Sequence, residues 1–367
     1  MIRVVEELKR SFADPKRAAK SAGLQYVADS SPGIRRVRKG KTFTYTDDAG
    51  RLIKDDKTLA RIKALVIPPA WEKVWICPSA NGHIQAIGYD AKGRKQYRYH
   101  AQWRSHRDLA KYMHIIDFAK SLPTIRAATR RDLRKPGLPR EKVLAATVRV
   151  LEKTLVRVGN EQYTKTNGTY GLTTLQDRHA TIKGGEVIFD FRGKHNVKRH
   201  VSFNDKRLAE VVRQCRDLPG DELFQYLDAN GKVVDITNND VNGYLKQISG
   251  KDFSAKDFRT WAGTLLAARA LHAMESTTIE RQIKKNIVAA VTTTAAHLGN
   301  TVAVCRKCYV HPAVFDTYLD GSLVKHLKRK ITNQLAQGGE CLSDEEQAVL
   351  RLLEYTLKQM KKVPIAA

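Results

Sequence analysis

The sequence predicts an α+β protein, with a small strand-rich N-terminal domain followed by a larger, mainly helical domain. Residues 24–107 contain short alternating runs broken by Asp-Asp, Gly and Pro, which is typical of strands. From residue 108 onward, apolar residues recur at helical spacing, apart from one strand-rich island. The 367 residues suffice for two or three domains. We therefore predict a boundary that separates residues 1–107 from residues 108–367.

The N-terminal domain is expected to begin with a basic helical extension over residues 1–23. Apolar side chains there recur at roughly helical spacing, at Val5, Leu8, Phe12 and Ala18. Strands are expected in the runs 42–46, 74–77 and 83–88. Lys92-Gly93 predicts a turn, and the stretch 94–100 that follows interleaves basic and aromatic residues. The linker to the second domain is expected at 104–110, with a helix starting at Leu109.

The second domain is expected to open with helices. Leu144, Val148, Leu151 and Leu155 keep one apolar face, and this helix is expected to end at Gly159-Asn160, a suitable C-cap. Arg157 would then lie at a helix end.

A three-stranded meander is expected next, through the runs 180–182, 186–191 and 200–203. Lys194 would lie at the tip of its second hairpin. Helices are expected to resume at Leu208, and the capping box Ser343-Asp-Glu-Glu346 predicts the start of the last one.

The charge balance indicates a polyanionic partner. Lys and Arg outnumber Asp and Glu by 65 to 38, a formal net charge of +27. Because the excess is spread along the chain, it favours nucleic acid over a membrane surface. A run of about 18 apolar residues and a signal peptide are both missing from the sequence. We therefore expect a cytoplasmic, nucleoid-associated protein whose five cysteines are thiols.

A tyrosine preceded by basic residues suggests chemistry on a phosphodiester. Guanidinium groups match the charge of non-bridging phosphate oxygens bidentately, so Arg157 and Arg259 can form an electrostatic clamp. The phenol of Tyr309 can displace one ester oxygen and hold the phosphate covalently. Each residue alone would more often be a surface charge or a packing residue, so the inference depends on the set and its order.

That order resembles the small type IB DNA topoisomerases of bacteria and poxviruses, whose catalytic domain is shared with the tyrosine recombinases. The motifs are Val156-Arg-Val-Gly-Asn-Glu-Gln-Tyr163, Phe191-Arg-Gly-Lys194, Lys256-Asp-Phe-Arg-Thr-Trp261, and Leu298-Gly-Asn300 followed by Tyr309. The resemblance covers most of the chain. It also includes the stretch 87–99, which looks like the family's groove-contacting segment.

The resemblance implies a role for each matching residue. Tyr309 would become joined to the DNA 3′ phosphate and release a 5′ hydroxyl. Arg157 and Arg259 would clamp the non-bridging oxygens, and Lys194 would protonate the departing oxygen. The DNA-binding positions implied are Gln96, Tyr97, Tyr99, Tyr163 and Lys256.

Asn300 departs from the poxvirus pattern, because a histidine is usual at this position. Its amide can still donate a hydrogen bond to a phosphate oxygen, but it carries no charge and transfers no proton. We expect Asn300 to act as a neutral donor. His297 lies one turn earlier, where a histidine is more often structural, so we do not assign it the role of the missing histidine.

Two other functions are compatible with parts of this pattern. A site-specific tyrosine recombinase shares the arginine, lysine, arginine and tyrosine set, but usually carries histidine where Lys256 stands and lacks a strand-rich first domain. A non-enzymatic DNA-binding protein of the same fold is the other alternative. Unlike the topoisomerase, such a DNA-binding protein would form no covalent adduct with DNA.

The resemblance implies a monomeric clamp around duplex DNA, preferably supercoiled, that needs neither a cofactor nor a metal. Gly40-Lys41-Thr42 suggests a P-loop, but Arg35 occupies the earlier glycine position. The sequence has no Asp-x-Asp motif of the kind that magnesium-dependent topoisomerases use. Cys305-Arg-Lys-Cys308 is a weak zinc signal without a second pair, although oxidation there could displace Tyr309.

Overall fold

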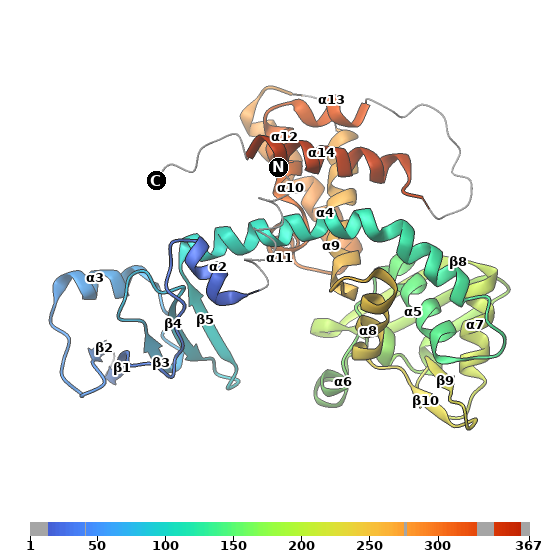
Figure 1. Cartoon of the computed structure of the whole chain (residues 1–367), viewed down its shortest axis with the longest axis horizontal. Coiled ribbons are helices and arrows are strands. Elements are labelled where there is room, and N and C mark those ends of the chain that lie inside the picture. The colour runs from blue at the N-terminus through green and yellow to red at the C-terminus, as the bar shows by residue number, and fades with distance from the viewer. Residues whose placement is uncertain (1–13, 41, 275–276, 329–340, 361–367) are drawn as a thin grey trace. The chain divides into compact units, whose positions relative to one another are not determined.

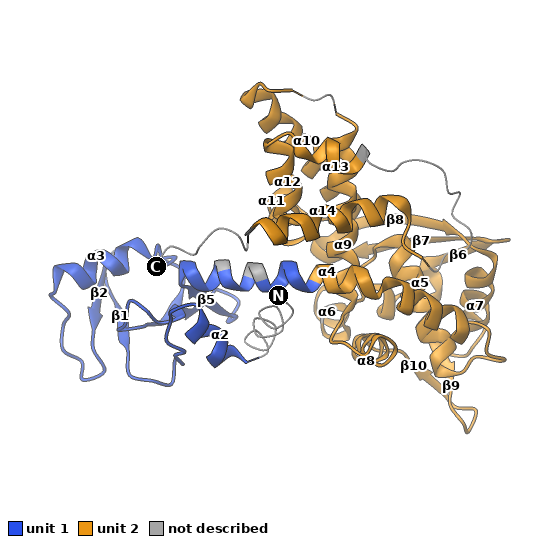
Figure 2. Cartoon of the chain, turned by 45° about the horizontal axis from the view of Figure 1, so that its top comes forward, with its two compact units in different colours: residues 1–114 blue, residues 115–367 orange. Residues whose placement is uncertain are grey.

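The computed structural model describes residues 14–40, 42–274, 277–328 and 341–360, which divide into two compact units, 1–114 and 115–367 (Figures 1 and 2). Helix α4 (Ala101–Asp132) belongs to both units. It begins eight residues before the predicted start at Leu109, so the expected break at 104–110 is wrong. Most of the expected N-terminal extension lies outside the described residues, and α2 (Pro15–Ser21) coincides with its end.

Unit 1 is built on a five-stranded antiparallel sheet with the order β2-β1-β3-β4-β5. Its strands are β1 (Ile34–Lys39), β2 (Thr42–Thr46), β3 (Glu72–Ile76), β4 (Ile84–Tyr89) and β5 (Lys95–Tyr99). The three predicted strands are therefore confirmed as β2, β3 and β4. The turn predicted at Lys92-Gly93 is also confirmed, since Gly93 has φ of 70° and its N–H bonds to the Asp90 carbonyl at 2.8 Å.

A small apolar core holds this sheet to helix α3 (Asp56–Ala64), which the sequence analysis did not predict. Ile62 of α3 is buried with Ile34, Val74 and Ile76 of the sheet. The Asp55 carboxylate caps the helix by accepting from the N–H of Thr58 at 2.8 Å. One face of α3 thus packs against one face of the sheet.

Unit 2 is mainly helical, and its helices and strands share one large core. The helices beyond α4 are α5 (Arg140–Thr154), α6 (Glu161–Asn167), α7 (Lys206–Arg216), α8 (Asn238–Ser249), α9 (Ala255–His272), α10 (Glu280–Leu298), α11 (Val302–Cys308), α12 (Pro312–Leu319), α13 (Ser322–Lys328) and α14 (Asp344–Met360). The predicted α+β class, with a strand-rich first part and a mainly helical second part, is confirmed.

The predicted meander is confirmed as the sheet β6 (Ala180–Lys183), β7 (Glu186–Gly193) and β8 (Val197–Asn204). A second hairpin, β9 (Gln225–Leu227) and β10 (Val233–Asp235), interrupts the region that was predicted to be wholly helical after Leu208. That part of the prediction is wrong, because strands of three residues are too short to show a period.

Helix α5 ends earlier than predicted. Leu155 adopts a left-handed conformation with φ of 55°, so the helix stops at Thr154 and not at Gly159. The chain then runs extended, and its carbonyls at Arg157 and Val158 accept the N–H groups of residues 172 and 173 at 2.8 and 2.7 Å. This pairing with a distant segment replaces the last helical turn.

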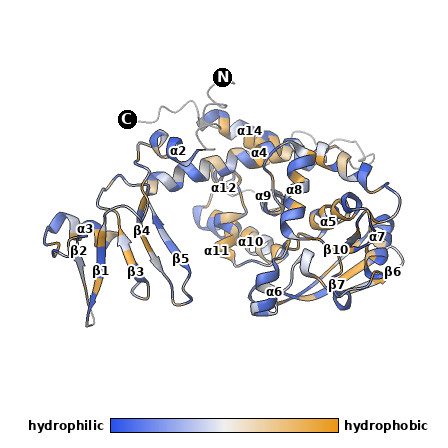
Figure 3. Ribbon diagram, turned by 60° about the horizontal axis from the view of Figure 1, so that its bottom comes forward, coloured by the Kyte–Doolittle hydropathy of each residue, from blue (hydrophilic) through white to orange (hydrophobic). Residues whose placement is uncertain are grey.

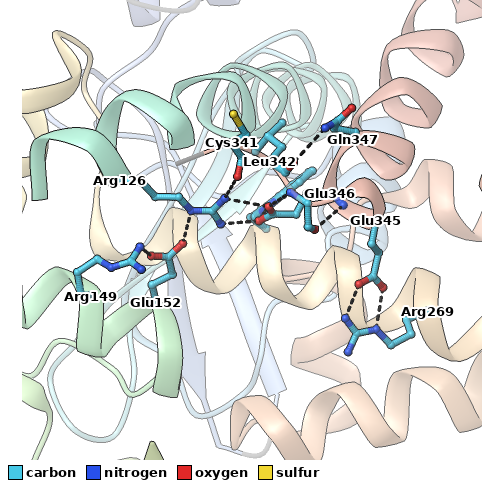
Figure 4. Close-up of polar contacts among 11 residues, drawn as sticks. Arg126, Arg149, Glu152, Arg269, Cys341, Leu342, Glu345, Glu346 and Gln347 are labelled. Atoms are coloured by element: carbon cyan, nitrogen blue, oxygen red, sulfur yellow. Dashed lines mark hydrogen bonds and ion pairs between the residues drawn. The ribbon is translucent and has the colours of Figure 1, made fainter. Parts of the chain in front are cut away.

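The last helix starts at the predicted capping box. The Ser343 N–H donates to the Glu346 carboxylate at 2.9 Å, and the Glu346 N–H donates to the Ser343 hydroxyl at 3.2 Å. Arg126 of α4 binds Glu346 through both terminal nitrogens, at 2.9 and 2.7 Å, and Glu152 of α5 through Nε at 2.8 Å (Figure 4). Two charged contacts thus join α14 to α4 and α5.

Membrane-spanning potential is low in the described helices taken singly, because none is long and apolar enough to cross a bilayer. Helices α10 and α11 pass that test only as a pair, and they are bent by 95° relative to each other.

Candidate active site

The candidate site is built around the C-terminal end of α10. Helix α10 ends at Leu298, and Gly299 follows in a left-handed conformation with φ of 60°. The last carbonyls of a helix have no partner within it. Three arginines donate to these carbonyls: Arg199 to His297 O at 3.2 Å, Arg259 to Leu298 O at 2.7 Å, and Arg157 to Gly299 O at 2.9 Å. The partial negative charge of a helix C-terminus favours cations there.

The three arginines come from separate elements of unit 2. Arg157 lies on the extended segment after α5, Arg199 on β8, and Arg259 in the second turn of α9. Arg259 is only 3% exposed, and its second terminal nitrogen donates to the carbonyl of Leu155. It therefore joins the ends of α5 and α10.

Burial and mutual repulsion weaken the affinity of these arginines for their protons. Burial, followed by the charge of Arg157, lowers the pKa of Arg259 to about 10, and Tyr309 partly opposes this shift. Burial lowers the pKa of Arg157 too; Tyr309 again opposes the shift and the charge of Arg199 adds to it. These shifts are the effect expected where cations are buried close together without a carboxylate beside them.

A narrow cleft brings the arginines together with Lys194. It is lined by Val156, Arg157, Tyr170, Phe191, Gly193, Lys194, Arg199, Arg259 and Leu298. In the described part of the chain no carboxylate lines this cleft. An anion entering it would meet positive charge from several sides without first displacing an internal acid.

Lys194 lies at the tip of the β7–β8 hairpin, as predicted. The turn comprises Lys194–Asn196, and both His195 and Asn196 have positive φ, at 64° and 60°. The Lys194 side chain is exposed. Its long side chain on a tight turn can follow a ligand held by the arginines.

Asn300 does not line the cleft, but its amide contacts Arg157, which does. Its Oδ1 accepts a hydrogen bond from Arg157, so its Nδ2 is the free end of the amide. That nitrogen is buried and has no hydrogen-bond partner in the described structure. An unpaired buried donor is costly, and a phosphate oxygen is one acceptor that would satisfy it.

Tyr309 directly follows α11, and its N–H bonds to the Cys305 carbonyl at 2.9 Å. The Arg259 guanidinium carbon lies 5.3 Å from the centre of the Tyr309 ring. Gly263 of α9 packs against the tyrosine backbone, since a Cβ there would lie 2.5 Å from the Tyr309 carbonyl oxygen. Helix α9 therefore contacts both the ring and the backbone of Tyr309.

The cysteines near Tyr309 are both thiols. Cys305 is buried and Cys308 is partly buried. Burial raises the pKa of Cys305 to about 11, which disfavours the thiolate that metal binding needs. Among the residues that the structure describes, no group of three or more His, Cys, Asp or Glu side chains is placed to hold a metal ion.

The predicted DNA-contacting residues divide between the two units. Tyr97 and Tyr99 lie on β5 with their rings stacked 5.7 Å apart, and both are exposed. Gln96 alternates to the other side of this edge strand, where its Nε2 donates to Asp90 at 2.9 Å. Figure 3 shows β5 as a hydrophilic strand, as expected for an open surface.

The remaining two DNA-contacting candidates belong to unit 2. Lys256 is exposed in the first turn of α9, one turn before Arg259. Tyr163 belongs to α6, but its side chain lies outside the described part of the structure.

Arg199 is the residue of this site that the sequence analysis missed. A signal was present, because the strand period of two places Arg199 on the same face of β8 as Val201 and the buried Phe203. An arginine on the inward face of a strand needs a partner or a function. What the sequence could not show is that this face meets the end of α10.

Comparison with known proteins identifies the family of this chain. The family model described as the eukaryotic DNA topoisomerase I catalytic core matches residues 100–337, and that of the bacterial DNA topoisomerase IB N-terminal domain matches residues 42–90. DNA topoisomerase 1B of Acanthamoeba polyphaga mimivirus is 34% identical over 293 residues, covering 78% of this chain and 87% of the relative. DNA topoisomerase 1B of vaccinia virus (strain Copenhagen) is 22% identical over 291 residues, covering 77% and 89%. The chain therefore belongs to the type IB DNA topoisomerases.

Proposed function

We propose that this enzyme relaxes supercoiled duplex DNA by nicking one strand through Tyr309, in a 3′-phosphotyrosyl intermediate, and resealing it after rotation. The observation that carries the proposal is the convergence of Arg157, Arg259 and the Asn300 amide at one helix end, with Tyr309 beside Arg259. These donors suit a phosphodiester, which is anionic and accepts hydrogen bonds on two non-bridging oxygens.

In the proposed cleavage step, the Tyr309 phenol loses its proton to water, its oxygen attacks the phosphorus, and the bond to the 5′ oxygen breaks. Charge grows on the non-bridging oxygens, where Arg157 and Arg259 would stabilise it. The departing 5′ oxygen takes a proton from Lys194, whose ammonium lines the same cleft. Resealing is the same path in reverse, with the 5′ hydroxyl as nucleophile.

This route would require neither ATP nor a metal ion. The phosphotyrosyl ester conserves the energy of the phosphodiester, and the torsion stored in the DNA drives rotation. Fixed cations can perform the charge stabilisation that metal ions perform in other phosphoryl transfer enzymes. We also propose that the enzyme acts as a monomer on cytoplasmic DNA, because a single chain contains every residue invoked here.

Plasmid relaxation in EDTA without ATP tests the proposal. We expect relaxation by the wild-type protein and none by Tyr309→Phe, which lacks only the nucleophilic oxygen. Denaturation with detergent during the reaction should leave protein joined to DNA for the wild type alone. Folded protein that fails to relax plasmid under these conditions would refute the proposal. Activity that depends on paired target sites would instead indicate a recombinase.

A further inference from the structure

We propose that Arg199 is a further catalytic residue, which binds the phosphodiester in the cleft and supplies the positive charge that the neutral Asn300 lacks. The inference rests on the function proposed above and adds a third guanidinium to its mechanism.

The guanidinium of Arg199 lies against the backbone just before Asn300. A Cβ built on Gly299 would lie 2.5 Å from one terminal nitrogen of Arg199 and 2.9 Å from its Cζ. Only a residue without a side chain leaves this space open. The charge of Arg199 is thus held beside the position where the poxvirus pattern has a histidine.

The charge of Arg199 is not neutralised by its neighbours. It lines the cleft with Arg157, Lys194 and Arg259, and the described residues that line the cleft include no carboxylate. Burial lowers the pKa of Arg199, because holding the charged guanidinium away from water is unfavourable. Gathering like charges is unfavourable unless a ligand offsets it. A phosphodiester in the cleft would provide that offset.

A purely structural role for Arg199 would use few of its hydrogen-bond donors. Among the described residues it makes one hydrogen bond, from a terminal nitrogen to His297 O at 3.2 Å, which could only help to cap α10. Arg157 and Arg259 already donate to the next two carbonyls of this helix end. A guanidinium has five N–H donors, so most of the Arg199 fork is available for phosphate oxygens.

The neighbouring Lys198 offers a matched control. It is a cation on the same strand, but strand alternation places it on the opposite face, and it is exposed and does not line the cleft. Replacing Lys198 removes one positive charge from β8 without removing one from the cleft. Any general effect of charge on DNA affinity should therefore affect Arg199→Ala and Lys198→Ala alike.

The test measures single-turnover cleavage of a duplex oligonucleotide that carries a site mapped by detergent trapping on plasmid. We expect Arg199→Ala to reduce the cleavage rate constant by about 10²-fold, Arg199→Lys to recover part of the loss, and Lys198→Ala to remain near the wild type. DNA binding, measured in a Tyr309→Phe background, should fall at least as much for Arg199→Ala as for Lys198→Ala.

A methylphosphonate at the scissile position separates a contact with the phosphate from a structural effect. It removes the negative charge, so the gap between wild type and Arg199→Ala should shrink on this substrate if Arg199 binds a non-bridging oxygen. An equal gap on both substrates, or a cleavage rate for Arg199→Ala equal to that of wild type, would overturn the inference. Failure of the wild type itself to cleave would instead reject the proposed function.

Discussion

The contact between Gly263 and Tyr309 leads to a sharp prediction for Gly263→Ala. Gly263 lies inside α9, where alanine is normally the better helix former by about 1 kcal/mol. Helix propensity alone therefore predicts a more stable protein. The surroundings predict the opposite, because the added methyl group would point at the backbone of the nucleophile.

The size of the clash follows from the structure. The new Cβ would lie 2.5 Å from the Tyr309 carbonyl oxygen, 3.2 Å from the Tyr309 Cβ and 3.1 Å from Leu298 Cδ1. Reaching ordinary contact at 3.4 Å requires the carbonyl to move by 0.9 Å. A backbone group cannot rotate away, and overpacking of this kind costs about 1–3 kcal/mol. After the gain in propensity, the free energy of unfolding should fall by about 0–2 kcal/mol.

Activity should suffer more than stability. A displacement of nearly 1 Å at a reacting group can cost about 10²-fold in rate, so we expect that loss in single-turnover cleavage by Gly263→Ala. Urea unfolding measures the stability change on the same preparation. Gly243→Ala in α8 is the control, because a Cβ there meets nothing within 4 Å. It should stabilise the protein by about 0.5–1 kcal/mol and leave cleavage unchanged. If Gly263→Ala cleaves at the wild-type rate and gains stability, the steric reasoning is wrong.

Three further predictions concern other parts of the chain. Arg126→Met should destabilise the protein by about 3–5 kcal/mol at pH 7 by leaving the buried Glu346 carboxylate without its cation, whereas Glu152 keeps its contact with Arg149. Burial raises the pKa of Glu346, but its contacts with Arg126 lower the pKa overall. The stabilisation is therefore present above the ordinary pKa of a glutamate and is lost as the pH falls through the lowered pKa. Urea unfolding should show a smaller difference in the free energy of unfolding between variant and wild type at pH 4 than at pH 7. Asp90→Ala should free the Gln96 amide and change the cleavage sites mapped on plasmid, with relaxation retained. Asn300→His should make cleavage faster at pH 5.5 than at pH 8, since only the protonated imidazole adds charge; a flat pH profile would argue against contact with phosphate.

The elements best predicted from sequence were those whose signals are local. The alternating β-branched run 42–46 became strand β2 with the predicted bounds, and the Ser343 capping box started α14. β1 was not predicted, because Ile-Arg-Arg-Val-Arg-Lys has too few apolar residues to show a period, although the sheet pairs it on both sides. Pairing with neighbouring strands decided its structure, and a single segment does not reveal that.

In the candidate site, too, some features follow from local sequence and others depend on distant segments. Tyr309 and Arg259 could be predicted from motif order, which is a property of the chain. The end of α5 and the position of Arg199 in the cleft could not, because both depend on segments far away in sequence: residues 172 and 173 pair with the chain after Leu155, and α10 meets β8. Periodicity indicates which face of an element turns inward, but not what it meets there.

The capping of α10 by arginines has a consequence for how the enzyme can release its product. Peptide carbonyls hold these side chains in place without cancelling their charge. An incoming phosphate therefore has no carboxylate to displace, and no carboxylate has to return when the phosphate leaves. If the proposed mechanism holds, the clamp would therefore keep one geometry through binding, cleavage and resealing. The site would return to its starting state as soon as the strand is whole, and the same molecule could act on the next turn of the DNA helix without rearranging its side chains.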